Sequence, residues 1–299
     1  MEIYLKEKIE YWIVLFFIKL VKILPENFTF NTLNISGKIV YLLMTKRRKL
    51  AIKNLSLAFK EKDEKEIKLL AKANFLSIAR TLAEILLIAS KKRTLEDFIE
   101  DEDGSLKQYL DATKDEKNNQ GVVFITAHFG NWEILANYFA QKGFPMTIIG
   151  RRGDNKLIED NITTPFRESY GNSNVHKSEA MSAMIKTLKV GGRIGILIDQ
   201  KAGNSGAKTT FFGRDCTTTS SVALMKLKYN PLIVPGFAIR QKSGKSNFIF
   251  LDPVEYIADD KENKEEKVKA MTQKYNDIFE EIVRKYPEQW FWMHNRWKI

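Results

Sequence analysis

Cysteine and histidine are scarce in this chain, which has 299 residues but one cysteine, Cys216, and three histidines. A single cysteine excludes an intrachain disulfide and argues against a cysteine-based zinc site. Low-complexity tracts and internal repeats are missing too, so the chain is neither disordered nor a repeat protein. With 44% hydrophobic and 28% charged residues, the composition predicts a globular protein with a sizeable core, in one large domain or two modest ones.

A hydrophobic run long enough to span a bilayer is also missing. Residues 11–18 are strongly apolar, but Lys19 and Lys22 interrupt the run, whereas a spanning helix needs about 20 mainly apolar residues. On a helix Lys8, Lys19 and Lys22 share one stripe. This pattern predicts that residues 1–24 form a membrane-anchoring helix that lies in or dips into the interface, with its lysines at the headgroups. A buried core helix is the alternative.

Acidic residues are outnumbered, and the formal net charge is +11. Nucleic acid, an anionic membrane or an acidic partner would each suit this charge. No nucleic-acid-binding motif is present, and the aromatic residues are not interleaved with the basic ones as a base-stacking platform requires. We therefore expect no nucleic acid partner and favour an anionic membrane surface.

The rest of the chain predicts a helical region with a polar connector over residues 25–120 and an α/β core over residues 121–299, together one compact domain. Apolar runs and helical spacing alternate along the core. Such alternation predicts a largely parallel sheet flanked by helices, with the last two strands antiparallel. The expected strands are 121–126, 144–150, 193–198, 232–240 and 247–256, and the expected helices include 132–141, 219–229 and one around 268–282.

The segment Thr126 to Glu133 carries the strongest chemical signal. His128 follows a buried strand, and Glu133 lies in the first turn of the next helix. In the turn between strand and helix, the Glu133 carboxylate can accept from one imidazole nitrogen and leave the other free as a base. Such a base removes the proton of a substrate hydroxyl, which then attacks a thioester directly, while Gly130 lets the substrate approach the backbone.

Two other interpretations of this segment stay open. His128 is alternatively a hydrogen-bonded histidine at a strand end with no catalytic role. A zinc site would make the protein a metal hydrolase, but no third ligand is near, and His176 and His294 are the only other histidines. We expect neither a metal nor a cofactor.

Several segments together resemble the bacterial lipid A biosynthesis acyltransferases, a branch of the lysophospholipid acyltransferase superfamily. The N-terminal apolar helix is similar to theirs, and the resemblance covers nearly the whole chain. The other matching segments are 48–55 (RKLAIKNL) with Ala58-Phe59, 127–133 (AHFGNWE), Asp199-Gln200, 211–213 (FFG) with the threonines that follow, and 287–298 (PEQWFWMHNRWK).

The resemblance implies an enzyme on the cytoplasmic face of the inner membrane. Such enzymes move an acyl chain from acyl carrier protein to a hydroxyl of an acyl chain on a lipid A precursor, in lipopolysaccharide assembly. His128 and Glu133 match the catalytic pair of the family. Another lysophospholipid or glycolipid as acceptor, coenzyme A as donor, and a membrane-binding protein without enzymatic activity remain alternatives.

Further candidate residues follow the other strands. We expect Arg151, Arg152, Asn155 and Arg167 to bind a phosphate headgroup or the developing oxyanion, because arginine makes paired, charge-assisted bonds to such groups. Asp199 and Gln200 end a strand at the sheet edge where ligands collect, and there they would orient the acceptor. Arg296 is expected to point at the site, the C-terminal tryptophans to pack in the core, and residues 201–210 to form a loop or a mobile cover.

Overall fold

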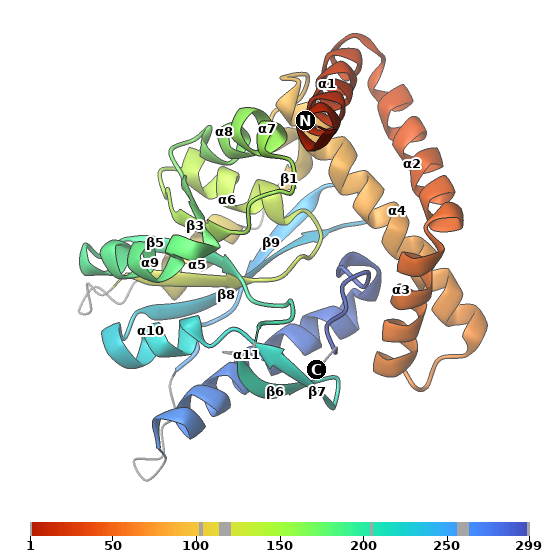
Figure 1. The fold of residues 1–299 in the computed structure, drawn as a ribbon. Coiled ribbons are helices and arrows are strands. Elements are labelled where there is room, and N and C mark those ends of the chain that lie inside the picture. The colour runs from red at the N-terminus through yellow and green to blue at the C-terminus, as the bar shows by residue number, and fades with distance from the viewer. Residues whose placement is uncertain (1, 102–103, 114–120, 204–205, 256–262, 298–299) are drawn as a thin grey trace.

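The structure is a computed structural model, and it describes residues 2–101, 104–113, 121–203, 206–255 and 263–297. Part of the expected connector, residues 114–120, and Tyr256 at the expected end of the last strand lie outside the described residues. Four helices come first, and strands alternate with helices after them (Figure 1). The first four helices are α1 (Glu2–Ile23), α2 (Glu26–Leu43), α3 (Thr45–Ala58) and α4 (Glu64–Ala89).

One seven-stranded sheet forms the centre of the protein, in the order β1-β9-β8-β2-β5-β3-β4. Strands β8, β2, β5, β3 and β4 are parallel, whereas β8 and β9 are antiparallel. This confirms the predicted mainly parallel sheet and its antiparallel pair. The strands are β1 (Ile99–Glu100), β2 (Val122–Thr126), β3 (Thr147–Gly150), β4 (Ser173–His176), β5 (Arg193–Leu197), β8 (Leu232–Arg240) and β9 (Ser246–Phe250).

Helices cover both faces of the sheet (Figure 1). One face packs against α9 (Ala180–Lys189), α10 (Ser221–Tyr229) and α11 (Lys264–Lys285), and the other against α5 (Ser105–Ala112) and α6 (Trp132–Gln141). Helix α6 has the predicted bounds, and Gly143 follows it with a φ of +91°, which a glycine adopts without strain. The shorter helices are α7 (Lys156–Ile158), α8 (Thr164–Glu168) and the turns η1 (Glu96–Phe98), η2 (Glu159–Thr163), η3 (Lys177–Glu179) and η4 (Pro287–Gln289).

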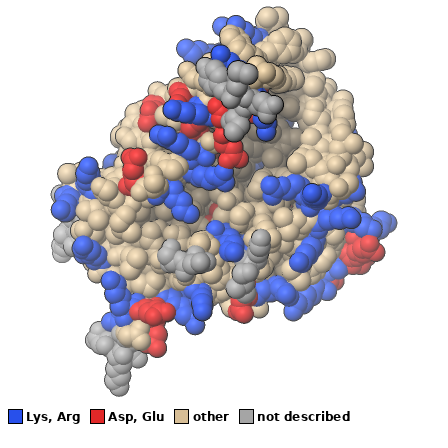
Figure 2. Space-filling view, in the orientation of Figure 1, with Lys and Arg blue, Asp and Glu red and all other residues tan. Residues whose placement is uncertain are grey.

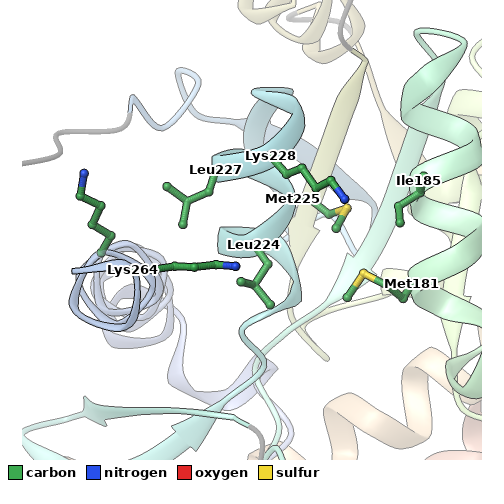
Figure 3. A pocket seen from close by; sticks show the side chains of 8 residues that line it. Met181, Ile185, Leu224, Met225, Leu227, Lys228 and Lys264 are labelled. Carbon is green, nitrogen blue, oxygen red and sulfur yellow. The ribbon is translucent and has the colours of Figure 1, made fainter. Parts of the chain in front are cut away.

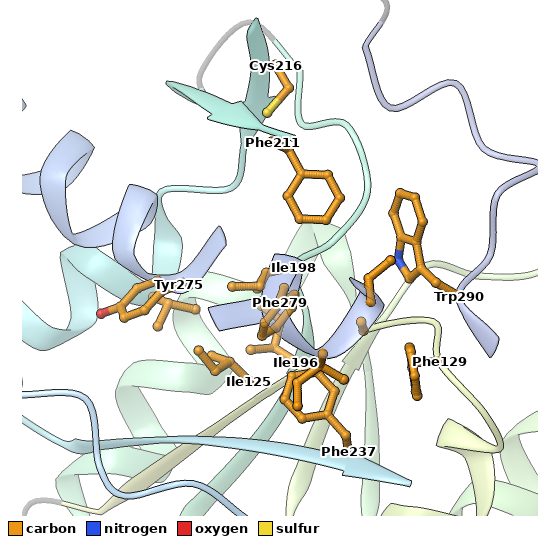
Figure 4. Close-up of a cluster of buried hydrophobic side chains, with 14 of the residues drawn as sticks. Ile125, Phe129, Ile196, Ile198, Phe211, Cys216, Phe237, Tyr275, Phe279 and Trp290 are labelled. Atoms are coloured by element: carbon orange, nitrogen blue, oxygen red, sulfur yellow. The ribbon is translucent and has the colours of Figure 1, made fainter. Parts of the chain in front are cut away.

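The buried side chains of alternate strand residues form a separate core on each face. Val123 and Ile125 of β2 point to the α9–α11 side, where Figure 4 shows Ile125 near Ile196 and Phe279. Val122 and Phe124 point to the α6 side, which is rich in aromatic rings. The strands are thus buried on both faces, as the continuous apolar run of β2 predicts.

The loop expected over residues 201–210 gives way to a β-hairpin at its end: residues 201–203 and 206 lie outside any strand, whereas residues 207–210 belong to one. Residues Ala207–Phe211 form β6 and pair with β7 (Arg214–Thr218) in antiparallel register. Four alternate side chains, Thr209, Phe211, Cys216 and Thr218, are buried against α11. The expectation was wrong for residues 207–210, because threonines fill half of the inward positions of the hairpin and hide the apolar alternation of a strand.

The N-terminal helices expose much apolar surface. Helix α2 packs closely on α4, where a Cβ at Gly37 would lie 2.9 Å from the Ala79 Cβ. The outer sides of α1 and α2 leave Trp12, Phe16, Ile35 and Leu43 about half exposed or more. Among the described helices, none combines the length and the apolar character that crossing a membrane requires.

Candidate active site

A cavity of about 840 Å³ opens at the carboxyl ends of β2, β3 and β5. Five of the predicted site residues line it: His128, Glu133, Arg151, Arg167 and Gln200. Figure 2 shows a hollow in this face of the molecule with basic side chains around it. The position agrees with the general rule that ligands of open α/β sheets bind beyond the carboxyl ends of the strands.

The imidazole of His128 is held by residues that follow β5. Its Nδ1 lies 2.8 Å from Oδ1 of Asp199, and the His128 backbone N–H donates to Oδ2 of the same carboxylate over 3.1 Å. Because a carboxylate only accepts, Nδ1 carries the proton, and Nε2 keeps its lone pair. The Gln200 side-chain amide lies 3.3 Å from Nε2, to which it can donate, and both side chains line the cavity.

Asp199 is a buried carboxylate with several donors. Besides His128, the indole N–H of Trp290 donates to it over 2.8 Å. Burial by itself raises the pKa of Asp199, but the charge and hydrogen bond of His128, with the Trp290 bond, hold that pKa below its ordinary value. The carboxylate is therefore ionised at neutral pH and accepts the Nδ1–H of His128.

Glu133 pairs with Arg167 and not with the imidazole. Arg167 donates to both carboxylate oxygens, over 2.9 and 2.6 Å, and the Trp132 indole N–H donates over 3.2 Å. Burial raises the pKa of Glu133, yet Arg167, Trp132 and the charge of His128 together keep it below the ordinary value. The hydrogen bond that we expected from His128 to Glu133 goes to Asp199 instead, because Glu133 turns toward the guanidinium on α8.

A buried polar cluster from α4 fixes the turn that carries His128. Glu84 is 1% exposed and forms ion pairs with Arg80 and Arg240. It also accepts from the Asn131 side chain over 2.8 Å, while Thr81 donates to the Gly130 carbonyl over 2.8 Å. The segment between β2 and α6 is thus bound to α4 by charge-assisted hydrogen bonds.

Gly130 packs against backbone and leaves no room for substrate. Its φ is +55°, and a Cβ there would lie 2.0 Å from the Ala238 carbonyl oxygen of β8. We expected this glycine to admit a substrate. The structure gives another reason for it, because only a residue without a side chain fits this contact at a positive φ.

The C-terminal segment around Trp290 pairs through its backbone with the turn that carries His128. Gly130 donates to the Gln289 carbonyl, and the Phe291 N–H donates to the His128 carbonyl, each over 3.0 Å. Trp290 and Trp292 are buried, which confirms their predicted core packing. Trp290 therefore packs in the core and also donates a hydrogen bond to Asp199 beside His128.

Four of the predicted binding residues do not line the cavity: Arg152, Asn155, Arg296 and Asp199, which was expected to orient the acceptor but is buried against His128. Asn155 caps α7 and donates to the Glu7 carbonyl and the Glu10 carboxylate of α1. Arg152 is exposed and does not line the cavity.

Arg296, which we expected to point at the site, is fully buried behind it. Its guanidinium donates to Thr218 Oγ1 and to the carbonyls of Thr217 and Gln200. It thus supports the strand end that carries Gln200.

Metal ligands do not cluster in the part of the chain that the structure describes: no group of three His, Cys, Asp or Glu side chains there has the geometry to hold an ion. His176 bonds to Ser178 away from His128, and His294 accepts from the Lys201 backbone N–H over 3.0 Å. The histidines thus serve separate hydrogen bonds.

His294 is a cavity residue to which the sequence assigned no role. Burial, with the positive charges of His128, Arg296 and Arg47, lowers its pKa to about 4 despite the nearby Asp199. The neutral ring accepts from Lys201 and so fixes the chain next to Gln200. Glu84 is the other residue that we did not single out, although a lone carboxylate among apolar helix positions was a usable signal.

The depressed pKa of His294 predicts acid-sensitive stability. An unfolded chain protonates this ring near pH 6.5, whereas the folded protein keeps it neutral down to about pH 4. The unfolded state binds more protons in this window, so stability falls as the pH falls. Between pH 6.5 and pH 4 we expect the free energy of unfolding of the unaltered protein to fall by an amount on the order of 1–2 kcal/mol because of this ring, a figure reduced for the partial exposure of His294. The variant His294→Asn should not show this part of the fall.

Urea denaturation of both proteins across that pH range measures this difference. His176→Asn is the matched control, because that histidine sits at an exposed hydrogen bond with Ser178. The prediction would be contradicted if the free energy of unfolding changed with pH in the same way in the unaltered protein and in His294→Asn.

Comparison with known proteins gives a consistent result across the chain. The sequence profile of the family described as bacterial lipid A biosynthesis acyltransferase matches residues 3–299. The lipid A biosynthesis lauroyltransferase of Escherichia coli (strain K12) is 25% identical over 271 residues, 88% of this chain and 82% of that protein. Lipid A biosynthesis acyltransferase 2 of Shigella flexneri is 24% identical over 287 residues, 94% of this chain and 87% of that protein.

The matched region contains the turn with His128, the strand end with Asp199 and Gln200, and the C-terminal segment with Trp290. The chain belongs to the bacterial lipid A biosynthesis acyltransferase family.

Proposed function

We propose that this protein transfers a fatty acyl chain from acyl carrier protein to a hydroxyl of a lipid A precursor. Membership in the family supports acyl transfer in lipid A biosynthesis. The observation that carries the mechanism is a single cavity whose polar end holds the imidazole of His128, with Asp199 hydrogen-bonded to it, and whose other end is apolar.

His128 acts as the general base in this proposal. Its Nε2 takes the proton of the acceptor hydroxyl while that oxygen forms a bond to the thioester carbonyl carbon. The carbonyl oxygen becomes an oxyanion, which the N-terminus of α6 and the Gln200 amide stabilise. The intermediate then expels the thiolate, which takes the proton from the imidazolium and leaves as a thiol. Asp199 stabilises that imidazolium, and the charge of Glu133 adds to it without a direct hydrogen bond.

The apolar end of the cavity suits the acyl chain. It lies between α6 and the sheet, where Phe124 of β2, Gly195 of β5 and Ile148 of β3 stand opposite one another. Phe139 and Phe250 also line it, and their rings are 5.0 Å apart. An alkyl chain that leaves water for such surfaces gains about 0.8 kcal/mol per methylene, so a slot of fixed depth selects chain length.

Basic side chains at the mouth suit the phosphates of a lipid A precursor. Arg151, Lys177 and Lys201 line the cavity, and Arg151 is exposed beside Asp154. Arginine binds phosphate through paired, charge-assisted bonds. Within the proposal these three residues hold the acceptor headgroup, while Arg167 stays bound to Glu133.

The exposed apolar sides of α1 and α2 suit a membrane surface. From Leu5 onward, where the side chains of α1 are described, seven large apolar side chains are exposed, and so are Lys8, Lys19 and Lys22. We place the protein on the cytoplasmic face of the inner membrane, with these helices at the anionic interface. There the acceptor lipid would reach the cavity without leaving the membrane surface.

A defined reaction tests the proposal. The purified protein is incubated with lauroyl-acyl carrier protein and a lipid A precursor that bears hydroxyacyl chains, and the lipids are analysed by mass spectrometry. We expect a product heavier by one acyl group. Transfer only to a lysophospholipid or glycolipid acceptor in a parallel reaction would reject the lipid A precursor as substrate.

Gly195 should set the donor chain length. A Cβ at this position would lie 2.8 Å from the Met146 sulfur, inside the slot. We expect Gly195→Val to shift kcat/KM toward shorter donors by about fourfold for each methylene that the slot no longer holds. Met146→Ala enlarges the slot and should shift kcat/KM toward donors with longer acyl chains. A panel of acyl donors from eight to sixteen carbons measures both; an unchanged ranking in both variants would show that the chain lies elsewhere.

A further inference from the structure

A second groove lies on the outer side of the helices behind the cavity. It has a volume of about 640 Å³ and runs between α9, α10 and the start of α11. Met181 and Ile185 of α9 line it together with Leu224 and Leu227 of α10, and Figure 3 shows Leu227 on the side of α10 that faces α11. Met181 is 44% exposed. The floor of the groove is therefore apolar surface that is accessible to a partner.

Lysines supply all the charge of this groove. Lys228, Lys264 and Lys267 line it, and no acidic side chain is among the described residues that do so. The nearest acids along α11 are Glu265 and Glu266, and Glu266 accepts from the Asn263 N–H in the cap of the helix. An apolar floor with a positive rim matches an acidic amphipathic surface, because complementary charge directs association and the apolar contact holds it.

The groove adjoins the catalytic cavity. Met181 and Leu224 line both spaces. A molecule seated between α9 and α10 therefore lies next to the cavity wall, and a flexible arm that passes these two side chains reaches the space before His128.

The position of the groove favours a soluble protein over a membrane surface as its partner. Figure 1 shows α9, α10 and the start of α11 on the side of the sheet away from α1 and α2. With the apolar sides of α1 and α2 on a membrane, as the proposed function requires, the groove faces the aqueous phase and accepts a soluble partner.

We propose that this groove docks the acyl carrier protein, a small acidic protein that carries the acyl chain on a flexible thioester arm. The inference rests on the proposed function and assigns a place to its donor. Lys228, Lys264 and Lys267 pair with acidic residues of the donor protein, and the arm passes Met181 and Leu224 to bring the thioester to the Nε2 of His128.

Charge reversal tests the docking separately from catalysis. The variant Lys228→Glu/Lys264→Glu/Lys267→Glu is compared with Lys60→Glu/Lys65→Glu/Lys72→Glu, which reverses three exposed lysines near the turn between α3 and α4. Both sets are made in the His128→Ala protein, and binding of lauroyl-acyl carrier protein is measured by titration calorimetry. We expect the groove variant to bind at least tenfold more weakly, and the control within about twofold of the parent.

Turnover with a small donor separates this inference from the proposed function. In the protein with His128, the groove variant should lose kcat/KM for lauroyl-acyl carrier protein but keep it for lauroyl-pantetheine, which has no protein to dock. Equal affinity in the groove and control variants would overturn the inference. So would unchanged carrier binding with a loss of binding to anionic phospholipid vesicles, which would make the groove a lipid site. Absence of transfer by the unaltered enzyme would reject the proposed function instead.

Discussion

Replacing Asp199 with asparagine should lower kcat by about 10²–10⁴-fold and leave the fold intact. In the structure this carboxylate accepts from His128 Nδ1 and fixes the proton there. An asparagine can turn its amide N–H toward Nδ1, which moves the ring proton to Nε2 and removes the base from the cavity. His128→Ala should reduce kcat at least as much, because it removes the base itself. Steady-state rates with saturating donor and acceptor measure both effects.

Glu133→Gln is the matched comparison for this prediction. It also neutralises a partly buried carboxylate near the imidazole, but the partner of this carboxylate is Arg167, and the bond between Nδ1 and Asp199 is retained. We expect a smaller loss of kcat, about tenfold, from the weaker electrostatic stabilisation of the imidazolium. A larger loss in Glu133→Gln than in Asp199→Asn would show that Glu133, as first expected from the sequence, orients the base.

Replacing Glu84 with leucine should lower the free energy of unfolding by about 3–5 kcal/mol. The carboxylate is buried, and its removal leaves the guanidinium of Arg240 without its charged partner, although Ser77 and Thr81 still accept from it, and leaves the amide of Asn131 without this acceptor. A buried charge that has lost its partner is far more costly than an exposed one. The turn that carries His128 should loosen too, so kcat should fall although Glu84 does not touch the cavity.

Urea denaturation followed by circular dichroism measures this effect. Glu64→Leu, at the exposed start of the same helix, removes an ion pair with Lys68 and should cost less than about 1 kcal/mol. Similar unfolding free energies for both variants would contradict a stabilising role of the buried cluster.

The local sequence pattern was sufficient to predict much of the secondary structure of the α/β core. The continuous apolar run before His128 predicted β2, and the helical spacing up to Gly143 predicted α6 with its observed bounds. These elements are determined by neighbours in the sequence, because buried strands are apolar and glycine ends helices. The antiparallel pair β8–β9 was predictable for the same reason, since a short turn joins its strands.

The partner of His128 was not predictable from spacing alone. Glu133 is five residues away in the sequence, whereas Asp199 reaches the imidazole only because β2 and β5 are neighbours in the sheet. Strand order is a long-range property that one sequence leaves open. The hairpin β6–β7 escaped notice because Asn276 of α11 satisfies its inward threonines, an interaction that local hydrophobicity does not reveal.

The involvement of Trp290 in the site has a consequence for biosynthesis. The indole that binds Asp199 lies 91 residues beyond that carboxylate, and the backbone on both sides of it pairs with the turn at His128. A ribosome-bound chain that ends before this segment can form β2 and β5, but it lacks the indole that donates to Asp199 and the two backbone hydrogen bonds that hold the turn at His128. The support of the turn at His128 is therefore complete only when the chain has been made through this segment and has folded back onto the sheet.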